Sequence, residues 1–103
     1  MKLLTKELIR KIPKLYAQDG EGWNAIAYVK FFALFSDWTW FVTEYDGENT
    51  FFGLVIGHEA ELGYFSLSEL QSLGWRIERD LYFTPTPINK LMVQYQYPES
   101  NAA

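Results

Sequence analysis

Two segments of alternating aromatic and β-branched residues, joined by one tight turn, constrain the fold of this chain more than any other feature. The segments are 38–45 and 50–57, and the turn between them contains Asp46-Gly47, a dipeptide typical of β-hairpins. We therefore predict an antiparallel hairpin at the centre of the domain. Strict alternation would divide the side chains of the first strand into two faces, Trp38, Trp40, Val42 and Glu44 against Thr39, Phe41, Thr43 and Tyr45.

Shorter elements are expected on both sides of the hairpin. Thr5 can cap a helix over 5–12, which Pro13 ends. Ser66 and Glu69 have the spacing of a capping box, which predicts a helix that begins there and ends near Gly74. The other expectations are strands over 25–34 and 62–65, a loop over 17–24, a β-like segment over 81–83, an extended bend at Pro85 and Pro87, and one or two helical turns over 88–95.

Length and composition predict a single folded unit. The chain has 103 residues, 49% of them hydrophobic, and its four Trp, seven Tyr and eight Phe are enough aromatic side chains for an adequate core. We expect one α+β domain over residues 1–97 and a frayed C-terminal tail over 98–103. The domain should contain an antiparallel sheet of three to five strands with short flanking helices.

The charge balance and the absence of cysteine exclude several classes of function. Nine Lys and Arg against thirteen Asp and Glu give a net charge of −4, the wrong sign for a protein that grips phosphates, so a nucleic-acid partner is disfavoured. Without cysteine there is no disulfide and no thiolate nucleophile or metal ligand. Charged residues interrupt the apolar ones over 1–12, which argues against a signal peptide or a membrane span. The cytoplasm is the default location.

One short segment could carry catalytic chemistry. His58, Glu59 and Glu61 lie close together in the sequence, and with Arg79 they would suit a small hydrolase or nucleotide-handling enzyme. If the strand continues, however, His58 points away from the face shared by Glu59 and Glu61. A single imidazole with scattered carboxylates has no known metal-site spacing, so we predict no metal and no other cofactor. The alternative is that these are exposed turn residues and that Arg79 forms an internal ion pair.

Aromatic side chains are the strongest candidates for a binding surface. Trp38, Trp40, Tyr45 and Tyr64 could form an exposed platform if they share one open sheet face. Such a platform could stack on single-stranded nucleic acid, but the chain offers no basic rim for it. Contact with another protein is favoured, since Trp and Tyr dominate interface hot spots. The alternative is that these aromatic residues belong to the core.

Acidic residues concentrate in two predicted turns, 46–49 and 58–61. If both turns lay at one end of the sheet, their charge would attract a basic partner. Successive turns of regular hairpins fall at opposite ends, which argues against one acidic patch.

Several ordered runs resemble an uncharacterised bacterial family of unknown function. The resemblance extends from residue 3 to about residue 91, and it implies small cytoplasmic proteins often encoded on plasmids and other mobile elements. It implies no activity, cofactor or catalytic residue. The runs are IPKLY (12–16), AYVKFF (27–32), WTW (38–40), TEYDG (43–47), FFGLV (51–55), ELGYFSLSEL (61–70), IERDLYF (77–83) and PTP (85–87).

Together these observations favour a small, non-enzymatic protein-interaction module. A regulatory or anti-defence role is implied only by the mobile-element setting of the family it resembles. The enzyme that would use Glu59, Glu61, His58 and Arg79 is the alternative, and a binder of single-stranded nucleic acid is the weaker one. The sequence gives no indication of oligomeric state.

Overall fold

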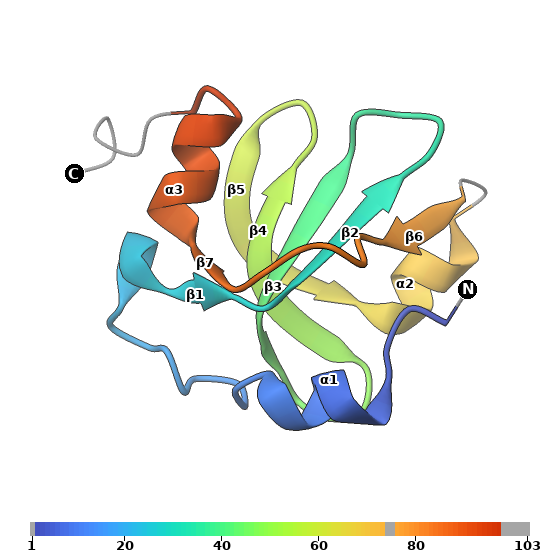
Figure 1. The fold of residues 1–103 in the computed structure, drawn as a ribbon, viewed down its shortest axis with the longest axis horizontal. Helices are drawn as coiled ribbons and strands as arrows, with labels where there is room; N and C mark the ends of the chain where they lie inside the picture. Colours follow the sequence, from blue (N-terminus) through green and yellow to red (C-terminus); the bar gives the residue numbers. More distant parts are fainter. Residues whose placement is uncertain (1, 74–75, 98–103) are drawn as a thin grey trace.

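The predicted hairpin forms the centre of a five-stranded antiparallel sheet (Figure 1). The computed structural model describes residues 2–73 and 76–97, and the strand order of the large sheet is β5-β4-β3-β2-β6. A second sheet pairs only β1 with β7. The elements are α1 (Lys6–Lys11), η1 (Gly22–Asn24), β1 (Ile26–Ala27), β2 (Val29–Ala33), β3 (Thr39–Tyr45), β4 (Thr50–Ile56), β5 (Ala60–Ser66), α2 (Leu67–Ser72), β6 (Ile77–Arg79), β7 (Thr86–Pro87) and α3 (Ile88–Gln94).

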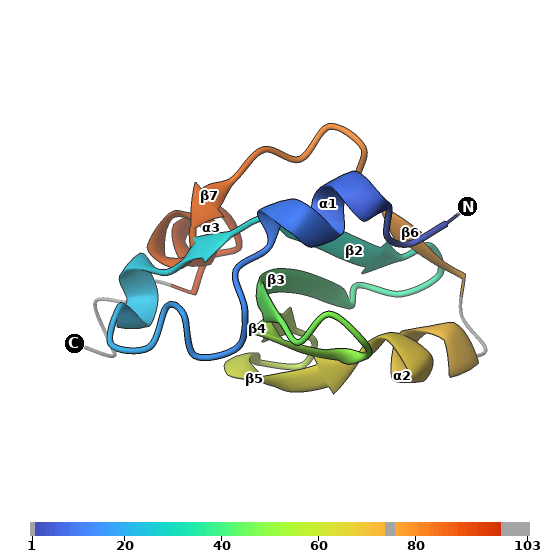
Figure 2. The same cartoon turned by 90° about the horizontal axis from the view of Figure 1, so that it is seen from below.

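The fold is α+β, as predicted, with short helices at the border of the sheet rather than in one stacked layer (Figures 1 and 2). Apolar side chains pack on both sheet faces, so the domain has two core clusters. One cluster joins the N-terminal segment and α2 to the sheet through Leu4, Leu70 and Phe31. The other packs α3 against Phe41 and Leu54. None of the helices in the described residues is long and apolar enough to cross a membrane.

Both predicted helix starts are confirmed. The Thr5 hydroxyl accepts a hydrogen bond from the Leu8 N–H at 3.2 Å. At α2 the Ser66 hydroxyl accepts from the Glu69 N–H, and the Glu69 carboxylate accepts from the Ser66 N–H, both at 3.1 Å. These caps satisfy N–H groups that the first turn leaves without an intrahelical partner. The predicted end near Gly74 and the predicted tail 98–103 lie outside the described residues.

An extra residue in β3 makes the predicted alternation of its side chains wrong after Val42. Val42 pairs with Gly53 and Glu44 pairs with Phe52, so Thr43 has no partner of its own and forms a β-bulge. Beyond the bulge, each side chain of β3 points to the sheet face opposite to the one that strict alternation predicts. Tyr45 therefore joins the cluster that contains Trp40, whereas Glu44 turns to the opposite face. The Thr43 hydroxyl donates to the Phe52 carbonyl at 2.9 Å and thereby fixes the bulge in place.

Two further strand predictions need correction. The strand expected over 25–34 is divided at Tyr28 into β1, which pairs with β7, and β2, which pairs with β3 and β6. The β-like segment expected over 81–83 is not a strand. Its place is taken by β6, just before it in the chain, whose charged composition gives no strand signal but which fills the open edge of β2.

The bulge makes the two paired glycines of the β4–β5 hairpin unequal, which gives a testable prediction. A Cβ on Gly53 would overlap the Phe41 carbonyl, whereas a Cβ on Gly63 would meet no atom within 4 Å. Gly53→Ala should therefore lower the free energy of unfolding by more than about 3 kcal/mol, and Gly63→Ala should change it by less than about 0.5 kcal/mol. Urea denaturation of both variants measures this. Equal effects would contradict the bulge geometry.

Candidate functional site

The four predicted catalytic residues do not form one site. His58 and Glu59 lie in the turn between β4 and β5, and Glu61 is on β5, whereas Arg79 is on β6. These two strands are the opposite edges of the sheet (Figure 1). Four strand spacings of about 4.8 Å separate them by roughly 19 Å. Arg79 therefore lies too far from the acidic pair to act with it on one substrate.

The Arg79 guanidinium has a structural contact instead. Its Nη1 donates to the carbonyl of Lys2 at 2.9 Å and to that of Leu3 at 2.7 Å, which fastens the N-terminal segment to β6. The neighbouring Asp80 pairs with Lys30 at 3.7 Å. Among residues 2–73 and 76–97, no three His, Asp or Glu side chains are grouped so that they could hold a metal ion.

The predicted aromatic platform is not one exposed face. Trp40 and Tyr45 are each only 5% exposed and belong to the core. Trp38 is half-buried on the same cluster, with its ring 5.9 Å from the His58 ring in an edge-on arrangement. Of the four predicted platform residues, Tyr64 alone has a largely exposed side chain, at 58%, and it lies on the opposite sheet face.

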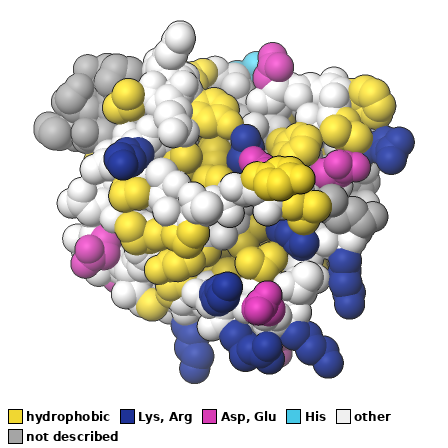
Figure 3. Space-filling model, viewed as in Figure 1, with side chains coloured by type: hydrophobic (Ala, Val, Ile, Leu, Met, Phe, Trp, Pro, Cys, Tyr) yellow, Lys and Arg dark blue, Asp and Glu magenta, His cyan; other side chains and the backbone are white. Residues whose placement is uncertain are grey.

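The two acidic turns also remain apart, because 46–49 and 57–59 lie at opposite ends of β4 (Figure 1). Lys and Arg side chains are densest at the lower border of the face shown in Figure 3, where α1 lies, and elsewhere on this face they are scattered among acidic and uncharged side chains. The described residues of this face therefore form no continuous positive track of the kind that a nucleic-acid backbone needs.

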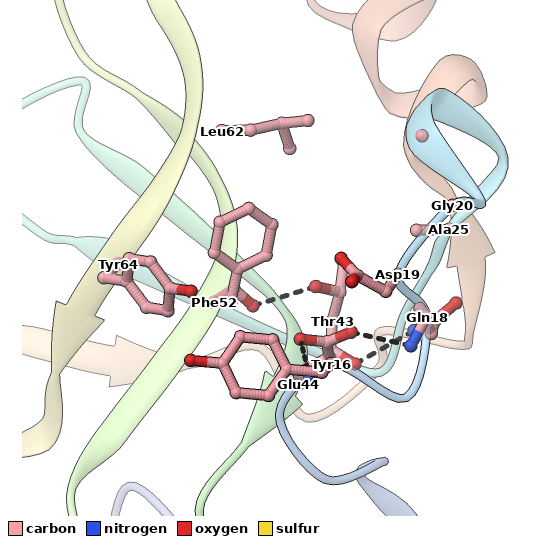
Figure 4. A pocket seen from close by; sticks show the side chains of 11 residues that line it. Tyr16, Gln18, Asp19, Gly20, Ala25, Thr43, Glu44, Phe52, Leu62 and Tyr64 are labelled. Carbon is pink, nitrogen blue, oxygen red and sulfur yellow. Dashed lines mark hydrogen bonds between the residues drawn. The ribbon is translucent and has the colours of Figure 1, made fainter.

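A pocket that the sequence did not predict lies around Tyr64. It has a volume of about 280 Å³ and is enclosed by β3, β4 and β5 on one side and by the segment 16–22 on the other. Figure 4 shows the rings of Tyr16, Phe52 and Tyr64 on one side and Asp19 on the other. The lining residues are Tyr16, Gln18, Asp19, Gly20, Gly22, Ala25, Thr43, Glu44, Phe52, Leu62 and Tyr64.

A buried carboxylate lies in this pocket. Glu44 is 5% exposed, and its two oxygens accept hydrogen bonds from the backbone N–H groups of Tyr16 at 2.8 Å and Gln18 at 2.7 Å. No Lys or Arg among the described residues forms an ion pair with it. Burying a carboxylate is costly unless it is hydrogen-bonded or paired, and here the two backbone N–H donors stabilise the Glu44 side chain.

Gln18 holds the loop wall of the pocket against the sheets. Its side-chain amide nitrogen donates to the carbonyls of Ile26 at 2.8 Å and Thr43 at 2.9 Å, and its oxygen accepts from the Ile26 N–H at 2.7 Å. One side chain therefore connects the 16–22 segment to both β1 and β3. The segment has turn-like composition, yet these contacts give it a fixed position.

The two tyrosines at the mouth of the pocket interact with each other. Tyr16 has a φ of 72°, a left-handed conformation uncommon for a residue other than glycine, and is 65% exposed. Its hydroxyl is the main cause of the raised pKa of Tyr64, through a hydrogen bond. Partial desolvation and the negative charges of Glu44 and Asp19 raise the Tyr64 pKa further. The pocket is thus an aromatic site that is also lined by two acidic residues, Asp19 and Glu44.

One sequence signal could have revealed this site. Glu44 is the only charged residue in β3, a strand whose other members are aromatic, apolar or threonine. A carboxylate in such a strand needs donors from elsewhere in the chain. Strict alternation placed it on the wrong face, and the donors come from a segment that resembled an ordinary loop.

Gln18 gives a stability prediction for the pocket wall. Gln18→Ala removes three hydrogen bonds and leaves partly buried backbone groups unsatisfied, so the free energy of unfolding should fall by about 2–3 kcal/mol. Gln71→Ala, at an exposed position of α2, is the matched control and should change it by less than about 0.5 kcal/mol. Thermal and urea unfolding measure both. A Gln18 variant as stable as the control would contradict the anchoring role.

His58 gives a second prediction, on the metal alternative. His58→Ala should change the free energy of unfolding by less than about 1 kcal/mol, because the residue is exposed in a turn. Added zinc or manganese should change the melting temperature of the wild type by no more than it changes that of the variant. A metal-dependent rise in the wild type alone would contradict the prediction that the protein binds no metal through His58.

Comparison with known families agrees with the resemblance seen in the sequence. The model of a family described as protein of unknown function (DUF2958) matches residues 3–96. No curated protein and no solved structure matches the chain. The matched region contains the whole of the large sheet and every residue that lines the pocket. The chain therefore belongs to the DUF2958 family.

Proposed function

We propose that this protein is a non-enzymatic protein-interaction module that receives a basic side chain of its partner in the Tyr16–Tyr64 pocket. The observation that carries this proposal is a buried carboxylate, without a basic partner among the described residues, beneath two exposed tyrosines. The cytoplasmic location, the mobile-element setting and a regulatory or anti-defence role rest on the family resemblance and belong to the same proposal.

The chemistry of the lining favours a cation. Aromatic ring faces carry partial negative charge and attract ammonium and guanidinium groups. Asp19 and Glu44 add two carboxylates, and their influence extends to the Tyr64 hydroxyl, whose pKa they raise. A phosphate or carboxylate ligand would meet repulsion from both. A guanidinium would donate to carboxylate oxygens that have spare lone pairs.

The size of the pocket favours one side chain over a whole cofactor. Its volume of about 280 Å³ falls just below the roughly 300–1,000 Å³ of small-molecule sites. A lysine or arginine side chain on a partner protein has a slender apolar stem that the Phe52 and Leu62 side chains could contact. The rest of such a partner would lie outside the pocket.

The two alternatives have less geometric support. An enzyme that used His58, Glu59, Glu61 and Arg79 would need residues from opposite sheet edges to meet. A nucleic-acid platform would need Trp40 and Tyr45 at the surface, and both are in the core.

Titration with a single capped residue tests the proposal. N-acetyl-arginine methylamide should shift the backbone resonances of Tyr16, Gln18 and Tyr64 and saturate in the millimolar range. The neutral isostere N-acetyl-citrulline methylamide should not. Bound guanidinium should also lower the Tyr64 pKa, because positive charge favours the phenolate, and a tyrosine-specific NMR titration measures this.

Two exposed aspartates provide a test position and its matched control. Asp19→Asn should weaken binding of the arginine probe about two- to five-fold without unfolding the protein. Asp37→Asn, also exposed but away from the pocket, should leave it unchanged. Equal binding of citrulline, or shifts that map elsewhere, would overturn the proposal.

A further inference from the structure

The edge of the sheet beside the pocket carries unpaired backbone groups. β5 is the last strand of the large sheet, and β4 is its one neighbour in the strand order. Figure 2 shows β5 along the lower border of the sheet, and none of the described elements lies beneath it. Seven residues form this edge strand, whereas the opposite edge strand, β6, has only three.

The hydrogen-bond phase of the β4–β5 ladder identifies the outward-facing groups. The Leu67 N–H donates to the Asn49 carbonyl at 2.8 Å, and the Gly57 N–H donates to the Glu59 carbonyl at 3.0 Å. Both contacts lie in the same register as the β4–β5 pairs, one at each end of the ladder. Hydrogen-bonded and non-hydrogen-bonded pairs alternate along an antiparallel ladder, so the hydrogen-bonded pairs are those of odd-numbered residues. The outward N–H and C=O groups therefore belong to the even-numbered residues of β5, which are Ala60, Leu62, Tyr64 and Ser66.

Little protects this edge from another strand. The outward N–H of Ser66 is used by the Glu69 carboxylate, but those of Leu62 and Tyr64 have no hydrogen bond among the described residues. Edge strands are usually guarded by proline, by charged side chains such as lysine, or by a bulge. β5 has no proline and no lysine, its one charged residue is Glu61, and its register with β4 is unbroken.

The free edge and the pocket are one surface. Leu62 and Tyr64 carry the outward backbone groups, and their side chains also line the pocket. In an antiparallel pair, residues directly opposite each other place their side chains on the same sheet face. A strand added beside β5 would therefore direct alternate side chains toward the pocket.

We propose that an extended segment of a partner protein adds to β5 as an antiparallel strand and places a lysine or arginine side chain in the pocket. This inference rests on the proposed function and specifies how the partner is recognised. Backbone pairing would supply sequence-independent contacts, and the pocket would select the basic residue. A second copy of this chain fits poorly, because β5 contains Glu61 but no basic residue.

A short peptide tests the strand addition. The probe is acetyl-Thr-Val-Thr-Arg-Thr-Val-Thr-amide, which alternates small β-formers around one arginine. It should bind at least tenfold more tightly than N-acetyl-arginine methylamide, and replacing its arginine with glutamate should abolish the gain.

N-methylation of the peptide backbone distinguishes a strand from other bound forms. When the arginine lies directly opposite Leu62 or Tyr64, its side chain points to the pocket and its amide faces β5, whereas the amides of the residues on both sides of it face solvent. Methylation of the arginine amide should therefore cost at least tenfold in affinity, and methylation of either flanking threonine amide should be tolerated. Equal losses at all three positions would overturn the proposal, and the inverse pattern would overturn its antiparallel orientation.

Hydrogen exchange gives the matching measurement on the protein. In the free protein the amides of Leu62 and Tyr64 should exchange rapidly and those of Glu61, Gly63 and Phe65 slowly, because only the second set pairs with β4. The peptide should slow exchange at Leu62 and Tyr64 at least tenfold. No added protection there would overturn strand addition.

The two proposals fail in different ways. If the single capped arginine binds but the peptide gains nothing and shows no alternation, strand addition fails and the pocket function stands. If the arginine and glutamate peptides bind equally with the alternating pattern, the basic-residue requirement fails and with it the proposed function. Protection of Leu62 and Tyr64 that rises with protein concentration, together with a dimer in sedimentation, would assign the edge to a second copy.

Discussion

The β-bulge at Thr43 is the constraint on which the rest of the structure depends. A single residue without a cross-strand partner exchanges the two faces of β3, so that Tyr45 enters the core and Glu44 faces the pocket. The same bulge brings the Phe41 carbonyl so close to β4 that only glycine fits at position 53. Core, strand pairing and candidate site therefore share one cause.

Once the bulge turns Glu44 inward, its charge has to be stabilised, and the segment 16–18 meets that need. The backbone N–H groups of Tyr16 and Gln18 contact the carboxylate, and the Gln18 side chain fastens the segment to β1 and β3. A stretch with loop-like composition thereby becomes a fixed wall. Its donors are neutral backbone groups, so no basic side chain of this segment occupies the carboxylate that our proposal assigns to a basic ligand.

The topology separates the candidate functions. It places Arg79 and the acidic residues near the β4–β5 turn on opposite edges, so that no joint catalytic site forms. It also leaves the long edge β5 open next to the pocket, where Leu62 and Tyr64 present backbone groups outward and side chains inward. The interaction surface that we propose uses this open edge and the pocket together.

The sequence by itself determined the features that depend on near neighbours. The caps at Thr5 and Ser66 involve partners three residues away, and the hairpin turn is held by the Asp46 carboxylate, which accepts from N–H groups two to four residues on. Only the tertiary structure decided the face of Glu44, the strand at 77–79 and the position of the 16–22 segment. Glu44 contacts Tyr16 across 28 residues, and β6 forms because β2 offers it an edge. The periodicity of one segment cannot predict contacts with partners that are distant in the sequence. An extra residue in a strand, for example, is favourable only when the neighbouring strands can accommodate it.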